Sequence, residues 1–328
     1  GFEFLPIEQS FTVESGVASV TLELERWSDL RALGWLPAEE HLHYDRLDAA
    51  HDADWLTLLA GDDLVHAHFL VLKGGNLPGI WARQFAYGTA GEATDGRRLI
   101  RPGEEYRDGV QGHINLLGVN EVIAPISTGG IGQPKVVYHY PAFYDVLKLA
   151  RTLDGIVGPA HGTALGRHPT GIVDTVLGAV DFFEIANTHL YKVDVWYALM
   201  SCGYVVPPAA GTDLPNFPFR ESWQPLLGET RMYVRVGDDL SFESWKRAVR
   251  RGEVFVTSGP LIDFQVNRAG PGATVNLPPG GGDVHVVVEL AGPRPLSALE
   301  VVKNGKVVET KVTRRFDGRV HRWRIDQR

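Results

Sequence analysis

The chain of 328 residues is poor in cysteine and lacks several common catalytic signatures. Its single cysteine, Cys202, excludes an internal disulfide framework and a cage of cysteine ligands around a metal, and it leaves the redox compartment open. The Gly-x-Ser-x-Gly turn that carries the nucleophile of many serine hydrolases is absent, which disfavours that class of enzyme.

Long apolar runs and basic stripes are also missing. No stretch approaches the ~20 apolar residues that span a bilayer, so no membrane span is expected. The formal net charge of −8 predicts that nucleic acid is not a partner. The expected partner is a small-molecule substrate, and the oligomeric state stays open.

The central part of the chain, from Gly34 to about Gly252, alternates short apolar runs with amphipathic stretches. This alternation predicts an α/β architecture with parallel strands, either a barrel or a doubly wound sheet. The phosphate-binding Gly-x-Gly-x-x-Gly and P-loop patterns are absent, which favours the barrel. The expected strands include Val65–Leu72, Gly155–Ala160, Asp181–Ile185 and Val205–Ala210, and the expected helices are Ala49–Ala60, Ala142–Leu153, Thr170–Ala179, Val193–Cys202 and Phe242–Arg251.

Both flanks of this region have a β texture. Residues 11–25 alternate around a Ser15-Gly16 turn, which predicts a short N-terminal β segment within residues 1–30. Residues 253–328 predict a small all-β module, in which Ala298–Val312 folds on the hairpin signal Asn304-Gly305. The barrel would then span residues 31–252. Such flanking segments are frequent in secreted multidomain proteins, so a secreted or periplasmic location is favoured over the cytoplasm.

Residues of the metal-ligand type stand beside the apolar runs. In an extended segment, His41 and His43 project from one face and can reach one metal. His161 and Asp213 each end an apolar run, where an α/β barrel places its chemistry. Taken singly, these residues have ordinary explanations: Glu105 could lie in a charged surface loop, and Asp213 could begin a turn.

The order of these residues resembles the PHP superfamily of metal-dependent hydrolases. More narrowly, it is similar to the CehA/McbA family, whose named members hydrolyse aryl carbamates such as carbaryl. Flanking matches around Trp35, Trp196-Tyr197, Arg231-Met232-Tyr233-Val234 and Thr257-Ser258-Gly259-Pro260 extend the likeness over roughly residues 34–265. The motifs that carry it are His41-x-His43, Gly103-x-Glu105, Gly112-His113-Ile114-Asn115, Ala160-His161 and Ala210-Gly211-Thr212-Asp213.

The resemblance implies a distorted, (β/α)7-like PHP barrel with metals at its strand ends. His41, His43 and Asp213 would bind one metal, and Glu105 would bridge to a second metal held by His113 and His161. Of these, Glu105, His161 and Asp213 are the expected catalytic residues. The implied cofactors are one or two divalent ions (Zn, Mn or Fe) that activate water, with no organic cofactor.

Two departures from the superfamily pattern limit the metal count. Members with three metals carry Thr-Asp-His after the second strand and Asp-x-His at the last motif. Here the corresponding residues are Lys73-Gly74-Gly75-Asn76 and Pro215, so we expect at most two metals. The usual aspartate before His-x-His is Glu40, which would support the ligands from behind.

Other polar and aromatic residues have open roles. Lys73 and Arg107 could contact an oxyanion or phosphate, or be ordinary surface residues. His139 could touch substrate or pack in a loop, and His189 is expected to line the pocket without binding metal. The second His-x-His pair, His66 and His68, is expected to be buried or at a rim. Core packing or an aromatic wall for an aryl group could account for Trp81, Tyr138, Tyr140 and Trp196.

Three functions follow from these observations. The first is a metal-dependent hydrolase that cleaves an ester, carbamate or amide bond with metal-activated water. The second is a phosphoesterase of the PHP type. The third is a non-catalytic, metal-containing binding module of a secreted multidomain protein.

Overall fold

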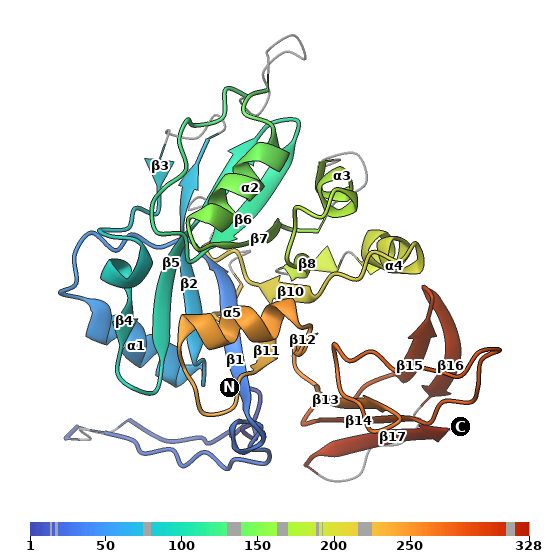
Figure 1. Cartoon of the computed structure of the whole chain (residues 1–328). Coiled ribbons are helices and arrows are strands. Elements are labelled where there is room, and N and C mark those ends of the chain that lie inside the picture. The colour runs from blue at the N-terminus through green and yellow to red at the C-terminus, as the bar shows by residue number, and fades with distance from the viewer. Residues whose placement is uncertain are drawn as a thin grey trace.

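A curled, mixed sheet of nine strands forms the larger part of the chain (Figure 1). The structure is a computed structural model that describes residues 1–13, 15–16, 19–74, 80–129, 139–162, 170–187, 190–191, 193–215, 225–312 and 319–327. Short strands β3 (Ile80–Trp81) and β4 (Ala93–Thr94) pair with β2 and β5. The main order is β12 (Val254–Thr257), β11 (Arg231–Arg235), β1 (Trp35–Leu42), β2 (His66–Lys73), β5 (Leu99–Asp108), β6 (Gly112–Leu117) and β7 (Ile156–Pro159).

The strands of this sheet are not all parallel, so the α/β class is confirmed but the distorted, (β/α)7-like barrel is not. The β1–β2 and β2–β5 pairs are parallel, whereas β5–β6, β6–β7 and β1–β11 are antiparallel. Only three residues, 109–111, join β5 to β6. A parallel pair needs a crossover of about a dozen residues or more, so this short link forces the antiparallel arrangement.

A second, three-stranded sheet closes part of the curl. Its parallel strands β8 (Phe183–Asn187) and β10 (Pro208–Gly211) are flanked by β9 (Leu190–Tyr191). Main-chain hydrogen bonds of 2.7 Å run from Asp181 N to Val157 O and from His43 N to Leu214 O. The small sheet therefore meets β7 on one side and β1 on the other, which brings the ends of these strands together.

The described helices confirm the five predicted from periodicity. They are α1 (Asp52–Gly61), α2 (Phe143–Thr152), α3 (Thr170–Val176), α4 (Val193–Ser201) and α5 (Phe242–Arg250), with 3-10 turns at Arg31–Leu33 and Gly88–Gly91. In the described part of the chain, none of the helices combines the length and the apolar character that crossing a membrane requires.

Helix α5 shows why the local pattern was sufficient. Ser241 caps it by accepting a hydrogen bond from Ser244 N, and the face with Phe242, Trp245 and Val249 is buried. This face packs into the largest apolar cluster, with Ala38 of β1 among its members. In Figure 1, α5 lies across β1, β11 and β12.

The second His-x-His pair is buried beneath α5, as predicted. Both His66 and His68 are 0% exposed, and their ring centroids lie 6.0 and 4.7 Å from that of Trp245. Burial lowers the pKa of His66 to about 4 and the pKa of His68 well below its usual range. The two rings are therefore neutral parts of the core.

This burial predicts a measurable acid sensitivity. Unfolded histidine takes up a proton near pH 6.5, whereas His66 resists it down to about pH 4, so the free energy of unfolding falls as pH drops through this window. Between pH 7 and pH 5, we expect the wild type to lose about 4 kcal/mol more stability than the His66→Leu/His68→Leu variant, about 2 kcal/mol for each histidine. Urea denaturation at both pH values measures the difference, and equal losses would contradict it.

The C-terminal residues form two further sheets. One consists of β13 (Leu261–Val266), β14 (Val286–Gly292) and β17 (His321–Gln327), and the other is the hairpin β15 (Ala298–Lys303) and β16 (Lys306–Val312). Asn304 and Gly305 have φ of 50° and 71°, as a two-residue hairpin turn requires. The position of a Cβ at Gly305 lies 3.3 Å from Tyr197 Cβ, so the turn packs on α4.

The proposed domain limits, 1–30, 31–252 and 253–328, remain a prediction. Strand β12 follows residue 252, yet it pairs with β11 in the large sheet.

The expected N-terminal strands are not formed in the described residues of 1–30, where the isolated bridge Phe4–Arg26 is the strand-like pairing. Side-chain contacts hold this segment instead: buried Glu3 accepts from Leu30 N at 2.7 Å and from Tyr233 OH at 3.4 Å.

Candidate metal centre

An irregularity in β1 directs its two histidines to one point. The register between β1 and β2 shifts between Glu39 and Leu42. The side chains of His41 and His43 then converge, with their Nε2 atoms 3.0 Å apart and both rings buried. Neighbouring strands supply the other candidate ligands to the same point.

Glu105 lies between two groups of candidate ligands. Its Oε2 is 3.2 Å from His43 Nε2 and 3.9 Å from His41 Nε2. Its Oε1 faces the other way, 2.8 Å from His113 Nδ1 and 3.4 Å from His161 Nε2. Each oxygen of this one carboxylate therefore belongs to a different ligand group, as in a carboxylate that bridges two cations.

Asp213 and His161 reach the cluster from the residues that follow β10 and β7. Both have left-handed backbones, with φ of 56° and 58°, a conformation that is uncommon outside glycine and concentrates at functional sites. Asp213 Oδ1 lies 3.1 Å from His43 Nε2, and Asp213 Oδ2 lies 3.3 Å from His161 Nε2. Asp213 thus also faces both groups.

The spacing of these atoms fits a divalent metal. Four ligand atoms at zinc-like bond lengths in a tetrahedron stand about 3.3 Å apart. The separations from the Nε2 atoms of His41 and His43 to each other, to Glu105 and to Asp213 run from 3.0 to 3.9 Å. Imidazole with carboxylate is a donor set for Zn, Mn or Fe.

Hydrogen bonds behind the two histidines set the nitrogen that each presents. His43 Nδ1 lies 2.9 Å from Leu70 O, which can only accept, so this nitrogen carries the proton. His41 Nδ1 lies 3.1 Å from the carboxylate of Glu184. Because Nδ1 of each ring is hydrogen-bonded away from the cluster, Nε2 is the ligand atom that each ring offers to a metal.

The charges of the cluster also favour a cation. Burial raises the pKa of Glu105, but Arg107 and His113 lower it well below its usual range. Burial also raises the pKa of Asp213, but the neighbouring His41 lowers it well below its usual range. Burial lowers the pKa of His41, but Glu184 and Asp213 raise it well above its usual range. In the metal-free protein, the proton that His41 keeps therefore balances part of the negative charge of the carboxylates.

His113 is less ready to bind a metal than the other candidates. Arg107 Nε, which always carries a hydrogen, donates to His113 Nε2 at 3.0 Å. Burial lowers the pKa of His113 to about 3, so the ring is neutral and its one proton lies on Nδ1, facing Glu105. Ligation through Nδ1 requires loss of that proton or movement of Arg107. The two halves of the centre are therefore unequal.

The remaining predicted residues are distributed around this cluster. Glu40 is buried and accepts from Asn115 Nδ2 at 3.2 Å, behind His41. The structure does not bring Lys73 to the cluster, because it donates to Ile123 O at 2.7 Å on the other face of the sheet, beside Glu104. His139 pairs with Asp108, 2.8 Å away. His189 lies outside the described residues.

The predicted aromatic residues lie in different parts of the molecule. The ring of Trp81 is stacked on His43 with a centroid distance of 5.9 Å and is partly exposed at the cluster. Trp196, a residue of α4, instead donates to Val206 O and packs on the apolar cluster of β8 and β10, and Tyr140 is 60% exposed. Tyr138 lies outside the described residues. Of the described aromatics, Trp81 is positioned to meet a substrate.

Sequence reasoning missed three buried polar residues next to the ligands: Glu39, Asn115 and Glu184. Glu39 Oε1 accepts from Thr212 N at 2.8 Å, which ties β1 to the end of β10, and burial raises the pKa of Glu39 to about 7. A signal was present, since charged residues inside apolar strand runs are rarely buried without a partner. Because the partners of these residues are distant in the sequence, the pattern could not predict what each residue does.

Gly211 allows β10 to approach β1 closely enough to form the cluster. A Cβ at this position would lie 2.5 Å from His41 Cβ and 2.9 Å from His41 N. We expect Gly211→Ala to destabilise the fold by about 1–3 kcal/mol and to weaken metal binding by displacing His41. Denaturation and metal titration measure both effects. Gly61→Ala, at an open position, is the control, and an unchanged Gly211→Ala would contradict the close approach.

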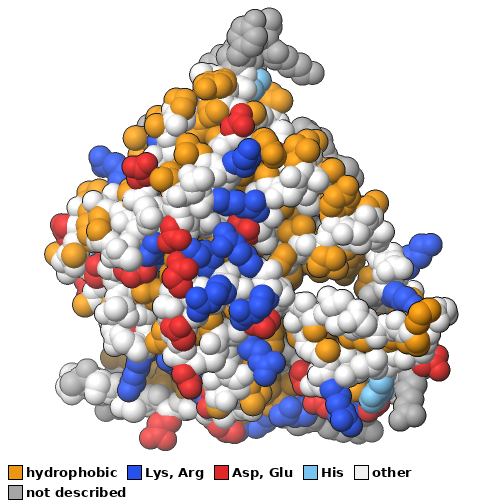
Figure 2. All heavy atoms as spheres, viewed as in Figure 1, with side chains coloured by type: hydrophobic (Ala, Val, Ile, Leu, Met, Phe, Trp, Pro, Cys, Tyr) orange, Lys and Arg blue, Asp and Glu red, His pale blue; other side chains and the backbone are white. Residues whose placement is uncertain are grey.

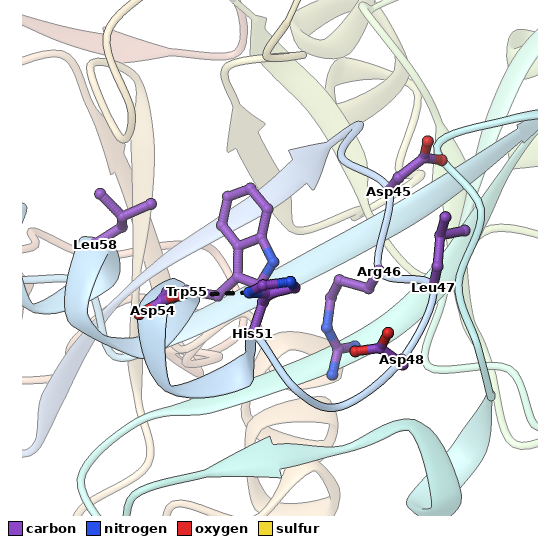
Figure 3. A pocket seen from close by; sticks show the side chains of 8 residues that line it. All are labelled: Asp45, Arg46, Leu47, Asp48, His51, Asp54, Trp55 and Leu58. Atoms are coloured by element: carbon purple, nitrogen blue, oxygen red, sulfur yellow. Dashed lines mark ion pairs between the residues drawn. The ribbon is translucent and has the colours of Figure 1, made fainter.

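The cavity in Figure 3 is separate from these residues. It measures about 420 Å³ and lies along the loop from β1 to the first turns of α1. None of the candidate ligands lines it, so the chemistry considered below belongs to the cluster. Its lining is Asp45, Arg46, Leu47, Asp48, His51, Asp54, Trp55 and Leu58.

The fold and the site define a class of protein: a mixed α/β sheet with a buried His/Glu/Asp cluster that could hold divalent metal ions. No family model matches the chain. No curated protein matches it either.

The chain is similar to several solved structures. One is a two-domain protein containing a predicted PHP-like metal-dependent phosphoesterase from Bacteroides vulgatus, with 10% identity, a TM-score of 0.43, and coverage of 89% of this chain and 85% of that one. Another is the lesion-specific endonuclease PfuEndoQ from Pyrococcus furiosus, with 14% identity and a TM-score of 0.40. This chain spans 56% of the endonuclease, which covers 66% of this chain. The likeness is remote, since the TM-scores of both structures lie below 0.5.

The expectation that nucleic acid is excluded as a partner is wrong. A third matched structure is Endonuclease Q in complex with a 27-mer duplex with an abasic lesion at its active site, with 15% identity, a TM-score of 0.39, and coverage of 66% of this chain and 56% of that one. Net charge was a poor criterion because it averages over the surface. Lys and Arg side chains gather over α5 in Figure 2, despite the net charge of −8. The sequence of this helix includes Arg247 and Arg250.

Proposed function

We propose that this chain is a metal-dependent hydrolase with a centre for two divalent ions. The observation that carries the proposal is the two-sided environment of Glu105, whose two oxygens face separate groups of buried histidines. Stabilisation of the fold alone does not account for a cluster in which four imidazoles meet two carboxylates. The membership in the CehA/McbA family remains part of this proposal.

The ligands divide between two positions. His41, His43, Glu105 Oε2 and Asp213 Oδ1 would hold the first ion, and Glu105 Oε1, His161 and Asp213 Oδ2 the second, with His113 when Arg107 releases it. Divalent ions bound there would polarise the substrate and supply hydroxide at neutral pH. Glu40 and Glu184 lie behind the ligands and reduce their freedom to move.

The residues of the chain itself would bind and orient the substrate. The ring of Trp81 beside His43 offers a face on which an aryl group can stack. The guanidinium of Arg107 stands 4.0 Å from Glu105 Oε1 and is mostly buried, so it adds positive charge where an oxyanion develops. Both features suit the attack of water on a polarised ester, carbamate or amide carbonyl.

A phosphoester is the second candidate substrate, and Arg107 favours it. A planar guanidinium matches two phosphate oxygens at once, and a phosphoester carries the charge that this residue would neutralise. The non-catalytic binding module remains the third candidate, in which the same centre would be structural.

A substrate panel tests the proposal on protein loaded with Zn²⁺ or Mn²⁺. It contains aryl esters, carbamates and amides, aryl phosphates, and a DNA duplex with an abasic site. Turnover of a carbonyl substrate supports the first candidate, and turnover confined to phosphates or DNA supports the second. A metal-loaded protein that turns over none of them contradicts the hydrolase and leaves the binding module.

A further inference from the structure

The buried carboxylate of Glu184 has no part in the ligand sets above, yet it contacts both of them. It lies in β8 and is 0% exposed, between the core residues Phe183 and Ile185. A carboxylate in such a strand costs free energy unless its oxygens are satisfied. The identity of its partners therefore indicates what it does.

The first partner is His41, a candidate ligand of the first position. Glu184 Oε1 lies 3.1 Å and Oε2 3.3 Å from His41 Nδ1. A carboxylate can only accept, so it selects the tautomer with the proton on Nδ1 and leaves Nε2 as the ligand atom.

The second partner is the main chain of His161, a candidate ligand of the second position. His161 N donates to Glu184 Oε2 at 2.5 Å. His161 has a left-handed backbone, which costs free energy for a residue with a side chain and persists where neighbours hold it. This hydrogen bond to Glu184 holds the backbone of His161 against β8.

We propose that Glu184 is a positioning residue that holds one ligand of each metal position, and so couples the two halves of the centre. The inference rests on the metal centre of the proposed function, but not on hydrolysis. Asn187 steadies the carboxylate by donating to Oε1 at 2.6 Å.

The contacts require a carboxylate rather than an amide. Glu184 receives donors on both oxygens, from Asn187 and His41 on Oε1 and from His161 on Oε2. Glutamine has one acceptor oxygen, and its NH₂ group would face a donor on the other side. Glu184→Gln keeps the volume of the side chain but cannot serve both ligands.

Metal titration of the metal-free protein tests the coupling. Zn²⁺ binding is followed by competition with a chelating dye, and thermal unfolding of each metal-free variant reports its fold. Glu104→Gln is the matched control, because Glu104 is an equally buried glutamate on the opposite face of the sheet, where it accepts from Ile123 N. Asn187→Ala is a milder variant that frees the carboxylate without removing it.

We expect Glu184→Gln to weaken both equivalents of Zn²⁺ by about 10–100-fold, Asn187→Ala to weaken both by less, and Glu104→Gln to change neither. Weakening of a single equivalent would contradict the coupling, and unchanged affinity would overturn the positioning role. A third equivalent that Glu184→Gln abolishes would make Glu184 a ligand instead.

The outcomes separate this inference from the proposed function. A wild type that binds metal but hydrolyses no substrate sinks the hydrolase, while the affinities still decide the role of Glu184. A wild type that binds no metal removes both.

Discussion

Hydrolysis by the Glu105→Gln variant is expected to fall by about 10³-fold or more, a loss of at least about 4 kcal/mol of transition-state stabilisation. The physical reason is the position of the carboxylate between two groups of ligands, with oxygens 3.2 Å from His43 Nε2 and 2.8 Å from His113 Nδ1. An amide offers one oxygen and no negative charge, so the pair of ions loses its shared ligand. Turnover of the best substrate of the panel is the measurement.

The control for this prediction is the neighbouring residue. Glu104→Gln makes the same chemical change one position earlier in β5, at an equally buried site that faces Lys73 and Ile123 instead of the cluster. Circular dichroism and thermal unfolding check that both variants keep the fold. If both variants kept the activity of the wild type, Glu105 would have no part in the reaction. If both lost activity to the same extent, the loss would be a general effect of removing a buried carboxylate.

The wild-type protein is expected to bind close to two equivalents of divalent metal. The His41→Ala/His43→Ala variant is expected to lose most of both. The first position presents two histidines whose tautomers are already set by Leu70 O and Glu184. Without these rings, Asp213 and Glu105 lack the ligands that complete a site. Elemental analysis of protein purified without added metal, and again after reconstitution, measures the loss.

The two equivalents are also expected to differ in affinity. Arg107 donates to His113 Nε2 and keeps the ring proton on the ligand nitrogen, so the second ion must break a hydrogen bond from a guanidinium that the first ion does not meet. Stepwise titration should therefore show a tight and a weaker equivalent, with the weaker one tighter in Arg107→Leu. Equal affinities would contradict the unequal halves.

The buried His66/His68 pair provides the matched control for the double variant. It has the same His-x-His spacing on the adjacent strand β2 and the same burial, but it packs on Trp245. His66→Leu/His68→Leu is expected to keep both equivalents of metal. If it lost metal as His41→Ala/His43→Ala does, loss of fold rather than of ligands would explain the result.

Local patterns predicted the helices and many strands well. Helix α5 begins and ends within a residue of its predicted span, because capping and a 3.6-residue period are properties of neighbouring residues. The hairpin at Asn304-Gly305 followed from the turn chemistry of two residues. The same reasoning failed for residues 11–25, where alternation was present but a hydrogen-bonded partner strand, which alternation cannot supply, is not found in the described residues.

The sequence by itself determined the residue types of the candidate centre: four histidines and two carboxylates, in an order that resembles one superfamily and that the structure brings within reach of one another. Only the tertiary structure decided that Glu105 faces two groups, that Arg107 holds His113, that Lys73 faces away, and that Glu184 joins both halves. These facts depend on strand pairing and on side-chain direction between residues as far apart as His41 and Glu184. Periodicity constrains a residue against its near neighbours, whereas a binding site is made of contacts that the chain forms only after it has folded.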